Sequence, residues 1–220
     1  MRPIKAIELP AIPESGGMIT EISVQVKDAN RCSVYLDGAF AFGLHMNVVA
    51  DAGLKKGIEL SYEDCQKHLE DDLYYKAFKR CLDYISYRPR SRFEIKRRLK
   101  DLGVPEPIAK RIEERLDSLG YLNDESFAEL WASSRFRSKG YGPARLLAEL
   151  RTKGIDADVA RQAVEAVCPP DKMEEQLAAL VVKAQHRYRT ENDSAKKKQK
   201  IIAFLARRGF SISAILAALN

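Results

Sequence analysis

The feature that most constrains the fold of this chain is a short pattern that occurs three times along it. In each copy an amphipathic stretch ends at a glycine, Gly103, Gly154 or Gly209, and a second amphipathic stretch follows. Apolar residues stand eight and four positions before each glycine, and five and nine positions after it. These positions are Ile95, Leu99, Ile108 and Ile112 in the first copy, Leu146, Leu150, Val159 and Ala163 in the second, and Ile201, Leu205, Ala214 and Ala218 in the third. Glycine readily takes the left-handed conformation that ends a helix, so the pattern predicts a helical unit repeated in tandem.

This repeat sets the expected domain boundaries. We predict helical repeats over residues 61–120, 121–168 and 169–220, each a bundle of three helices. A three-helix unit of about 50 residues is marginal in stability alone. We therefore expect stacking of neighbouring units, or docking on a partner, to complete the burial of its apolar surface. Ahead of the repeats we expect a flexible leader over 1–17, which is rich in proline and glycine, and a β-hairpin region over 18–60.

The region before the helices alternates between apolar and polar side chains, which is typical of half-buried strands. Ile22, Val24 and Val26 form the first such run, and residues 28–30 form the expected turn after it. The dipeptide Asp37-Gly38 lies between two alternating runs and predicts a tight hairpin, because both central residues of a type I′ turn need positive φ. The fold class is therefore mainly α, with tandem three-helix repeats and a small N-terminal antiparallel β-hairpin or sheet.

Helix starts are recognisable at the same place in two repeats. The stretch 61–87 predicts the first helix, with one break allowed. Ser91 followed by Glu94 forms a capping box that begins the next helix. In the second repeat Gly142 takes the place of Ser91, and Pro143 follows at the first helical position, where its missing N–H costs nothing.

No constellation of catalytic or metal-binding residues occurs in the sequence. His45, His68 and His186 lie far apart along the chain, and no phosphate-binding loop of the GxxxxGK[ST] type is present. The loop over 140–143 is rich in glycine and could seat an anion at a helix N-terminus, but a simple helix start explains it better. We therefore expect no enzymatic activity, no bound metal and no cofactor.

The cysteines and the hydropathy pattern point to an ordinary intracellular protein. The cysteines are scattered and lack the CxxC spacing of metal or redox sites; they are Cys32, Cys65, Cys81 and Cys168. We expect reduced, buried thiols in a cytoplasmic protein. No apolar run is long enough to span a membrane and no signal peptide is recognisable, so we expect no membrane partner. We also expect a monomer.

Basic residues gather at one place in each repeat. The chain has 37 Lys and Arg against 31 Asp and Glu, a formal net charge of +6. The basic side chains cluster where the first helix of a repeat ends and where its second helix runs. We call this set the basic face; it consists of Arg88, Arg90, Arg92, Lys96, Arg135, Arg137, Lys139, Arg145, Arg151, Lys197 and Lys198. Its recurrence favours a polyanion or an acidic protein groove as the partner.

The order of several motifs resembles the bacterial RecX family of regulatory proteins. The stretch 77–99 (AFKRCLDYISYRPRSRFEIKRRL) is similar to the first repeat of that family, and the stretch 139–155 is similar to its second repeat. The junction over 120–128 (GYLND, then FA) is similar to the family's most recognisable motif, and the hairpin at 35–38 to its N-terminal extension. One departure is Asn123, which stands where the family commonly has an acid.

The resemblance implies an elongated, curved array of three-helix repeats that binds the RecA recombinase filament in its helical groove. It also implies restraint of filament growth, ATP hydrolysis, strand exchange and the co-protease activity that triggers the SOS response, without catalytic residues or a cofactor. Our leading hypothesis is therefore a non-enzymatic regulator in DNA repair and recombination, whose basic face contacts acidic or phosphate-lined surface of the filament.

Two other classes of function stay open. A three-helix unit also suits a DNA-binding module. The third helices begin with the acidic stretches 105–107 and 156–158, which disfavours sequence-specific binding and leaves weak, non-specific binding to DNA. The other alternative is a helical scaffold for an acidic protein partner.

Overall fold

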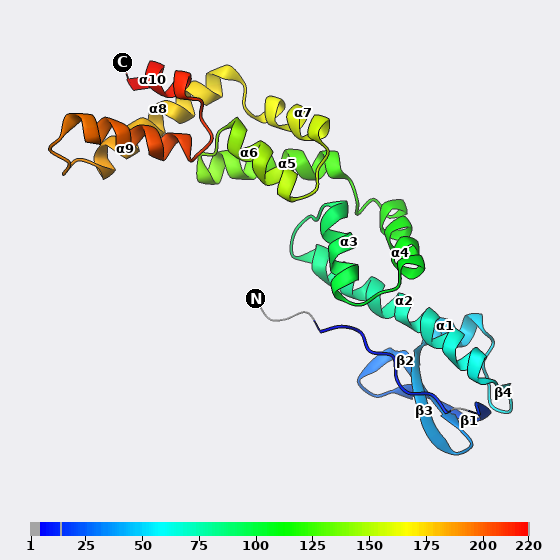
Figure 1. Cartoon of the computed structure of the whole chain (residues 1–220). Coiled ribbons are helices and arrows are strands. Elements are labelled where there is room, and N and C mark those ends of the chain that lie inside the picture. Colours follow the sequence, from blue (N-terminus) through cyan, green and yellow to red (C-terminus); the bar gives the residue numbers. More distant parts are fainter. Residues whose placement is uncertain (1–4, 14, 220) are drawn as a thin grey trace. The chain divides into compact units, whose positions relative to one another are not determined.

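The computed structural model describes residues 5–13 and 15–219 (Figure 1), so residues 1–4 and 14 of the expected leader lie outside the described residues. The chain divides into two compact units, the first made of Met1–Arg88 with Ile95–Ser118 and the second of Pro89–Glu94 with Leu119–Asn220. The elements before the repeats are β1 (Gly17–Gln25), β2 (Asp28–Leu36), β3 (Ala39–His45), α1 (Met46–Asp51) and β4 (Glu59–Leu60). The first repeat consists of α2 (Tyr62–Ser86), α3 (Arg92–Asp101) and α4 (Glu106–Ser118), the second of α5 (Asp124–Lys139), α6 (Pro143–Thr152) and α7 (Ala157–Val167), and the third of α8 (Pro170–Arg187), α9 (Ser194–Ala206) and α10 (Ile212–Leu219).

The predicted hairpin is confirmed. Asp37 and Gly38 have φ of +48° and +85° and join β2 to β3. Over the part of the chain that the structure describes, the sheet has four antiparallel strands in the order β3-β2-β1-β4. Its inner face buries Val34 and Phe42 in one cluster with Leu69 of α2. The first helix of the first repeat therefore serves also as the cover of the sheet.

The first strand differs from the prediction in its turn and in its buried face. The turn after it occupies 26–27 rather than 28–30, because β2 already begins at Asp28. Val24 and Val26 are 61% and 104% exposed, so neither side chain belongs to the core. The alternation of apolar and polar residues correctly predicted the strand. It does not show which part of the strand is covered by a helix, and therefore which apolar side chains are buried.

A buried aspartate ties the sheet to α2. Asp72 has no exposed surface. Its carboxylate accepts hydrogen bonds from both Nη atoms of Arg31, at 3.0 and 3.1 Å, and from the backbone N–H of His45 at 2.7 Å. The ammonium group of Lys76 lies 2.7 Å from the same carboxylate. Because a buried charge is tolerated only when it is paired and hydrogen-bonded, this cluster fixes α2 against β2 and β3.

The three glycine turns of the repeats share one structure, as predicted. The φ angle is +72° at Gly103, +71° at Gly154 and +90° at Gly209. In each turn the amide of the residue after the glycine donates to the carbonyl of a leucine that lies four positions before the glycine. This is a Schellman-type helix end. These bonds join Val104 to Leu99 at 3.1 Å, Ile155 to Leu150 at 3.1 Å and Phe210 to Leu205 at 3.4 Å.

The apolar positions before each glycine are all buried, as expected, whereas the positions after it are buried only in part. Ala214 is half-buried and Ala218 is exposed. The position six residues after the glycine is buried in all three repeats, as Ala109, Ala160 and Ile215. A shift of one residue turns the buried face of a helix by about 100°. The face predicted for the third helix of the third repeat is therefore confirmed only in part: Ala214 packs against the core cluster, whereas Ala218 is exposed.

Equivalent contacts recur at two places in the second unit, where the start of a middle helix meets the glycine turn of the next repeat. In the first joint the hydroxyl of Ser91 donates to the carbonyl of Lys153 at 2.6 Å. In the second joint the amide of Gly142 donates to the carbonyl of Arg208 at 2.7 Å. Ser91 and Gly142 both stand twelve positions before the glycine of their own repeat, and Lys153 and Arg208 each directly precede a glycine. The repeats therefore connect at equivalent positions, through a side-chain hydroxyl in the first joint and a backbone amide in the second.

The N-terminal segment takes the equivalent position in the first unit. Leu102 directly precedes Gly103, and its carbonyl accepts a hydrogen bond from the amide of Ile7 at 3.0 Å. Residues 5–12, which contain no helix or strand, run along α2 from its C-terminal half toward its N-terminus. This segment thus caps the glycine turn that has no preceding repeat.

Buried thiols allow a first test of the core. Burial raises the pKa of the Cys81 thiol to about 12 and that of Cys168 to about 11. Only the thiolate reacts with iodoacetamide, so near pH 8 about one Cys81 side chain in ten thousand is reactive. We expect mass spectrometry to find both cysteines unmodified after brief alkylation of the native protein, and modified in concentrated guanidinium chloride. Rapid modification of either one in the native protein would contradict this core.

Candidate partner-binding surface

The basic face is most clearly formed in the second repeat. Arg135, Arg137 and Lys139 lie at the end of α5, and Arg145 and Arg151 lie on α6. All are exposed except Arg135, which is half-buried. Among residues 5–13 and 15–219, the side chains of Lys139 and Arg151 have no hydrogen-bond or ion-pair partner. Their charges are therefore open to a binding partner.

Glu149 holds two of these arginines. Its carboxylate lies 3.5 Å from Nε of Arg135 and 3.8 Å from Nε of Arg145, and it accepts a hydrogen bond from the indole N–H of Trp131 at 3.1 Å. Each guanidinium lies over an aromatic ring, Arg135 at 4.3 Å from the centroid of Trp131 and Arg145 at 5.5 Å from that of Tyr141. These are cation–π distances. We call Arg135 and Arg145, with Glu149 between them, the arginine pair.

An ion pair at the first joint adjoins this cluster. The ammonium group of Lys153 lies 2.9 Å from Oε1 of Glu94 and 4.7 Å from the ring centroid of Trp131. Both side chains of the ion pair are largely buried, at 22% and 11% exposed. The tryptophan therefore lies between the arginine pair and the joint. Neither Trp131 nor Glu149 was singled out from the sequence, because their role depends on the contact of α5 with α6.

The basic residues of the first repeat are less exposed than the prediction of a surface stripe requires. Arg88 and Arg90 are half-buried and engaged in contacts. Arg92 is also half-buried, and its Nη2 donates to the carbonyl of Leu122 at 3.1 Å, so it holds together two segments of its own chain. Lys96 is exposed and lies 3.7 Å from an acid on α4.

In the third repeat the two predicted lysines differ in exposure. Lys198 is exposed on α9, whereas Lys197 is half-buried. Two further arginines of this repeat pack on an aromatic ring instead of facing a partner: Arg208 lies 3.8 Å and Arg187 5.7 Å from the centroid of Phe204. The exposed positive charge of this repeat is therefore smaller than its sequence implies.

The glycine-rich loop before α6 does not form an anion site. The amide of Gly142 donates to the carbonyl of Arg208 at 2.7 Å, and the amide of Ala144 donates to that of Gly209 at 3.3 Å. An anion at this helix start would have to displace the second joint. The loop serves the connection between two repeats, in agreement with the preferred interpretation of the sequence.

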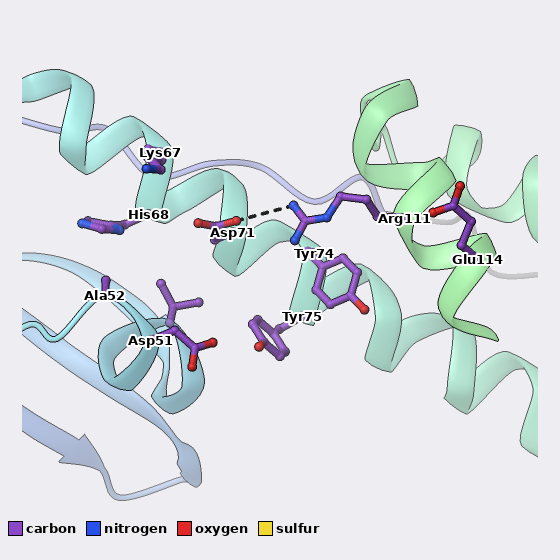
Figure 2. A pocket seen from close by; sticks show the side chains of 10 residues that line it. Asp51, Ala52, Lys67, His68, Asp71, Tyr74, Tyr75, Arg111 and Glu114 are labelled. Carbon is purple, nitrogen blue, oxygen red and sulfur yellow. Dashed lines mark ion pairs between the residues drawn. The ribbon is translucent and has the colours of Figure 1, made fainter. Parts of the chain in front are cut away.

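A polar hollow of about 550 Å³ lies in the first unit between α1, α2 and α4 (Figure 2). Its charges compensate one another: Arg111 lies 3.5 Å from Asp71, and its guanidinium is 5.0 Å from the ring centroid of Tyr74. Burial lowers the pKa of His68 and raises that of Tyr74. No serine, threonine or cysteine is among the residues that line the hollow. Among the residues that line the hollow, only the tyrosines carry a side-chain hydroxyl, and none carries a thiol.

Within the described residues, no group of three or more His, Cys, Asp or Glu side chains could hold a metal ion. No described helix combines the length and the apolar character that crossing a bilayer requires.

Known protein families match this chain along most of its length. The model of the Regulatory protein RecX N-terminal domain matches residues 17–61, and those of the first, second and third three-helix domains of RecX match 77–116, 123–164 and 173–219. Regulatory protein RecX of Bacillus subtilis is 34% identical over 204 residues, which cover 92% of this chain and 76% of that protein. The protein of the same name from Listeria welshimeri is 31% identical over 203 residues, 91% of this chain and 74% of that protein.

Solved structures are similar as well. A crystal structure of regulatory protein RecX aligns with a TM-score of 0.72 and 29% identity, covering 92% of this chain and 98% of that one. A crystal structure of RecX from Lactobacillus salivarius aligns with a TM-score of 0.59 and 27% identity, covering 66% and 94%. The mainly helical fold is therefore shared with the first of these structures over 92% of this chain and with the second over 66% of it.

Proposed function

The chain belongs to the RecX family of regulatory proteins, and on this premise we propose that it is a non-enzymatic regulator of the RecA recombinase in the cytoplasm. It binds the RecA filament on DNA in the helical groove and restrains ATP hydrolysis, strand exchange and co-protease activity. Through these it acts on DNA repair, recombination and the SOS response. The observation that carries the proposal is the set of exposed, unneutralised basic side chains on the second repeat.

Tandem repeats suit a partner that is itself a polymer. Lys139 and Arg151 in the second repeat and Lys198 in the third are exposed on successive three-helix units. A filament offers the same surface at each protomer, so one chain can engage several equivalent sites. Linked weak contacts of this kind give a much higher overall affinity than any one of them.

Sequence-specific reading of DNA is the less favoured function. In the described repeats, α4 begins with Glu106, and α7 has Asp156 as its N-cap and Asp158 in its first turn. A recognition helix places this end against the bases and phosphates of the major groove, where carboxylates are repelled. Any direct contact with DNA is therefore expected to be weak and non-specific.

Replacing Lys139 and Arg151 together by glutamate is expected to weaken filament binding at least about tenfold, because two attractive contacts become repulsive. Both side chains are exposed, so the fold is retained. Binding is measured by co-sedimentation with RecA assembled on single-stranded DNA, and inhibition by the rate of RecA's DNA-dependent ATPase.

The matched control is the double change Lys172→Glu and Lys183→Glu on α8. Both lysines are exposed, and the net charge changes by the same amount. This variant is expected to inhibit like the original chain. Full inhibition by the Lys139 and Arg151 variant would disprove this binding surface. Equal binding to single-stranded DNA with and without RecA would favour the DNA-binding module instead.

A further inference from the structure

The arginine pair has an arrangement that ordinary surface arginines lack. In both Arg135 and Arg145 the nitrogen that approaches Glu149 is Nε. A guanidinium group carries five N–H donors, and the edge formed by its two Nη atoms can grip one carboxylate through two parallel hydrogen bonds. Among the described residues neither arginine has a hydrogen-bond acceptor for that edge, and the two side chains are 32% and 49% exposed.

We propose that the arginine pair is the part of the basic face that recognises a carboxylate, and that its ligand is an acidic side chain in a segment of the protein partner. This inference rests on the proposed function and names the chemistry of the contact. Glu149 and the two rings are the positioning groups, and the two guanidinium ends are the binding groups.

The positioning groups reduce the cost of binding. An arginine side chain ordinarily loses much rotamer freedom when it is immobilised at an interface. Here the Arg135 guanidinium already lies on Trp131 and the Arg145 guanidinium on Tyr141, and both are drawn to Glu149. A ligand carboxylate therefore meets donors that are already restricted in orientation.

The surrounding charge favours a protein carboxylate over a nucleic acid. The cluster joins three cations, the arginine pair and Lys153, to the two acids Glu149 and Glu94, which leaves one net positive charge. Residues 121–168 as a whole contain seven basic and seven acidic side chains. A nucleic-acid strand presents a negative charge about every 3.4 Å and binds best to a uniformly positive surface. The Glu149 carboxylate between the two arginines repels a strand with many phosphates. A single ligand carboxylate can still bind at the outer ends of the two guanidinium groups.

The test exploits the difference between arginine and lysine. The double change Arg135→Lys and Arg145→Lys keeps the charge but removes the forked edge that binds a carboxylate through two bonds. Trp131 is the only tryptophan of the chain, and its ring contacts Arg135, so its fluorescence reports binding at the site. The full chain and the variant are titrated with hexaglutamate peptide and with an oligothymidine strand, and are then tested on RecA filaments.

We expect hexaglutamate to change Trp131 emission in the original chain, and the double variant to bind both hexaglutamate and the filament about tenfold more weakly. Equal binding of peptide and filament by the two proteins would overturn the carboxylate site and leave the proposed function standing. A response to oligothymidine alone, lost in the variant, would overturn the choice of a protein ligand. A response to hexaglutamate that the variant loses, with no filament binding by either protein, would support the site and refute the proposed function.

Two controls accompany the measurement. Arg115→Lys with Arg161→Lys makes the same kind of change at two exposed arginines outside the basic face, and is expected to bind like the original chain. Circular dichroism melts verify that the variants are folded at the assay temperature. Where the double variant melts too early, the single change Arg145→Lys at the more exposed arginine is measured, with the same direction expected and a loss of severalfold.

Discussion

Replacing Asp72 by asparagine is expected to lower the free energy of unfolding of the first unit by about 3–5 kcal/mol, the usual cost of removing one partner from a buried ion pair. The carboxylate of Asp72 is fully buried and receives Arg31, Lys76 and the amide of His45. An asparagine retains one acceptor and adds two donors, which then face other donors. Two cations with little access to water also lose their counter-charge.

The neighbouring residue supplies the control for this prediction. Asp71 precedes Asp72 on α2, is 40% exposed and lies 3.5 Å from Arg111. The change Asp71→Asn removes an exposed ion pair and is expected to cost less than about 1 kcal/mol. Unfolding is followed by alkylation of Cys65 and Cys81 in the first unit and by Trp131 fluorescence in the second. A loss of similar size in both variants would refute the role given to the buried carboxylate.

The second large effect is expected at Gly209, where alanine should cost about 2–5 kcal/mol and open the second joint. A φ of +90° disfavours any residue with a Cβ by about 1–2 kcal/mol. The added Cβ would also lie 2.3 Å from the backbone nitrogen of Arg145, and such overpacking typically costs about 1–3 kcal/mol. Because backbone cannot rotate away, we expect faster hydrogen exchange of the Gly142 and Ala144 amides that form this joint.

The equivalent glycine of the first repeat distinguishes the cost of the positive φ from the cost of the steric overlap. Gly103 has a φ of +72°, and the nearest atom to an added Cβ outside its own turn is the Cβ of Ala6 at 3.8 Å. The change Gly103→Ala is therefore expected to show only the conformational cost of about 1–2 kcal/mol. Chemical denaturation and hydrogen exchange of both variants decide the matter. Equal losses would mean that the joint adds nothing to the stability of the third repeat.

Features set by neighbouring residues were predictable from the sequence. The turn at Asp37-Gly38 follows from the backbone freedom of those two residues, and each glycine turn follows from a glycine placed after a helical apolar face. Helix α1, with six residues, was not predicted, because fewer than two helical turns give no periodic signal.

Features set by residues far apart in the chain could not be predicted. Asp72 is one acid among several on α2, and nothing near it in the sequence shows that its partner Arg31 lies 41 positions earlier. The hydroxyl of Ser91 serves as the expected helix cap, accepting from the amide of Glu94, but also donates to Lys153. Only the packed structure reveals this second role.

The candidate site also contains features that were predictable from the sequence and features that were not. Charge counting located the basic residues, but it could not distinguish Arg92, which binds a carbonyl of its own chain, from Lys139, which has no partner among the described residues. The arginine pair depends on Glu149 and Trp131, whose identities give no sign of a binding site. Their contribution is geometric, and it arises only where α5 packs on α6.

The polarity of the two joints has a consequence for assembly. A donor at the start of one middle helix meets an acceptor at the glycine turn of the next repeat. Because these two surfaces differ, the same contact made between separate chains would join them head to tail into an open fibre. Over the described residues, both remaining groups are occupied. The acceptor at Leu102 is taken by Ile7. The amide of Asp193, the N-cap of the middle helix α9, donates to Oε1 of Glu191 at 3.4 Å. The series of repeats is thus self-terminating, and a head-to-tail fibre of this protein has no open end on which to grow.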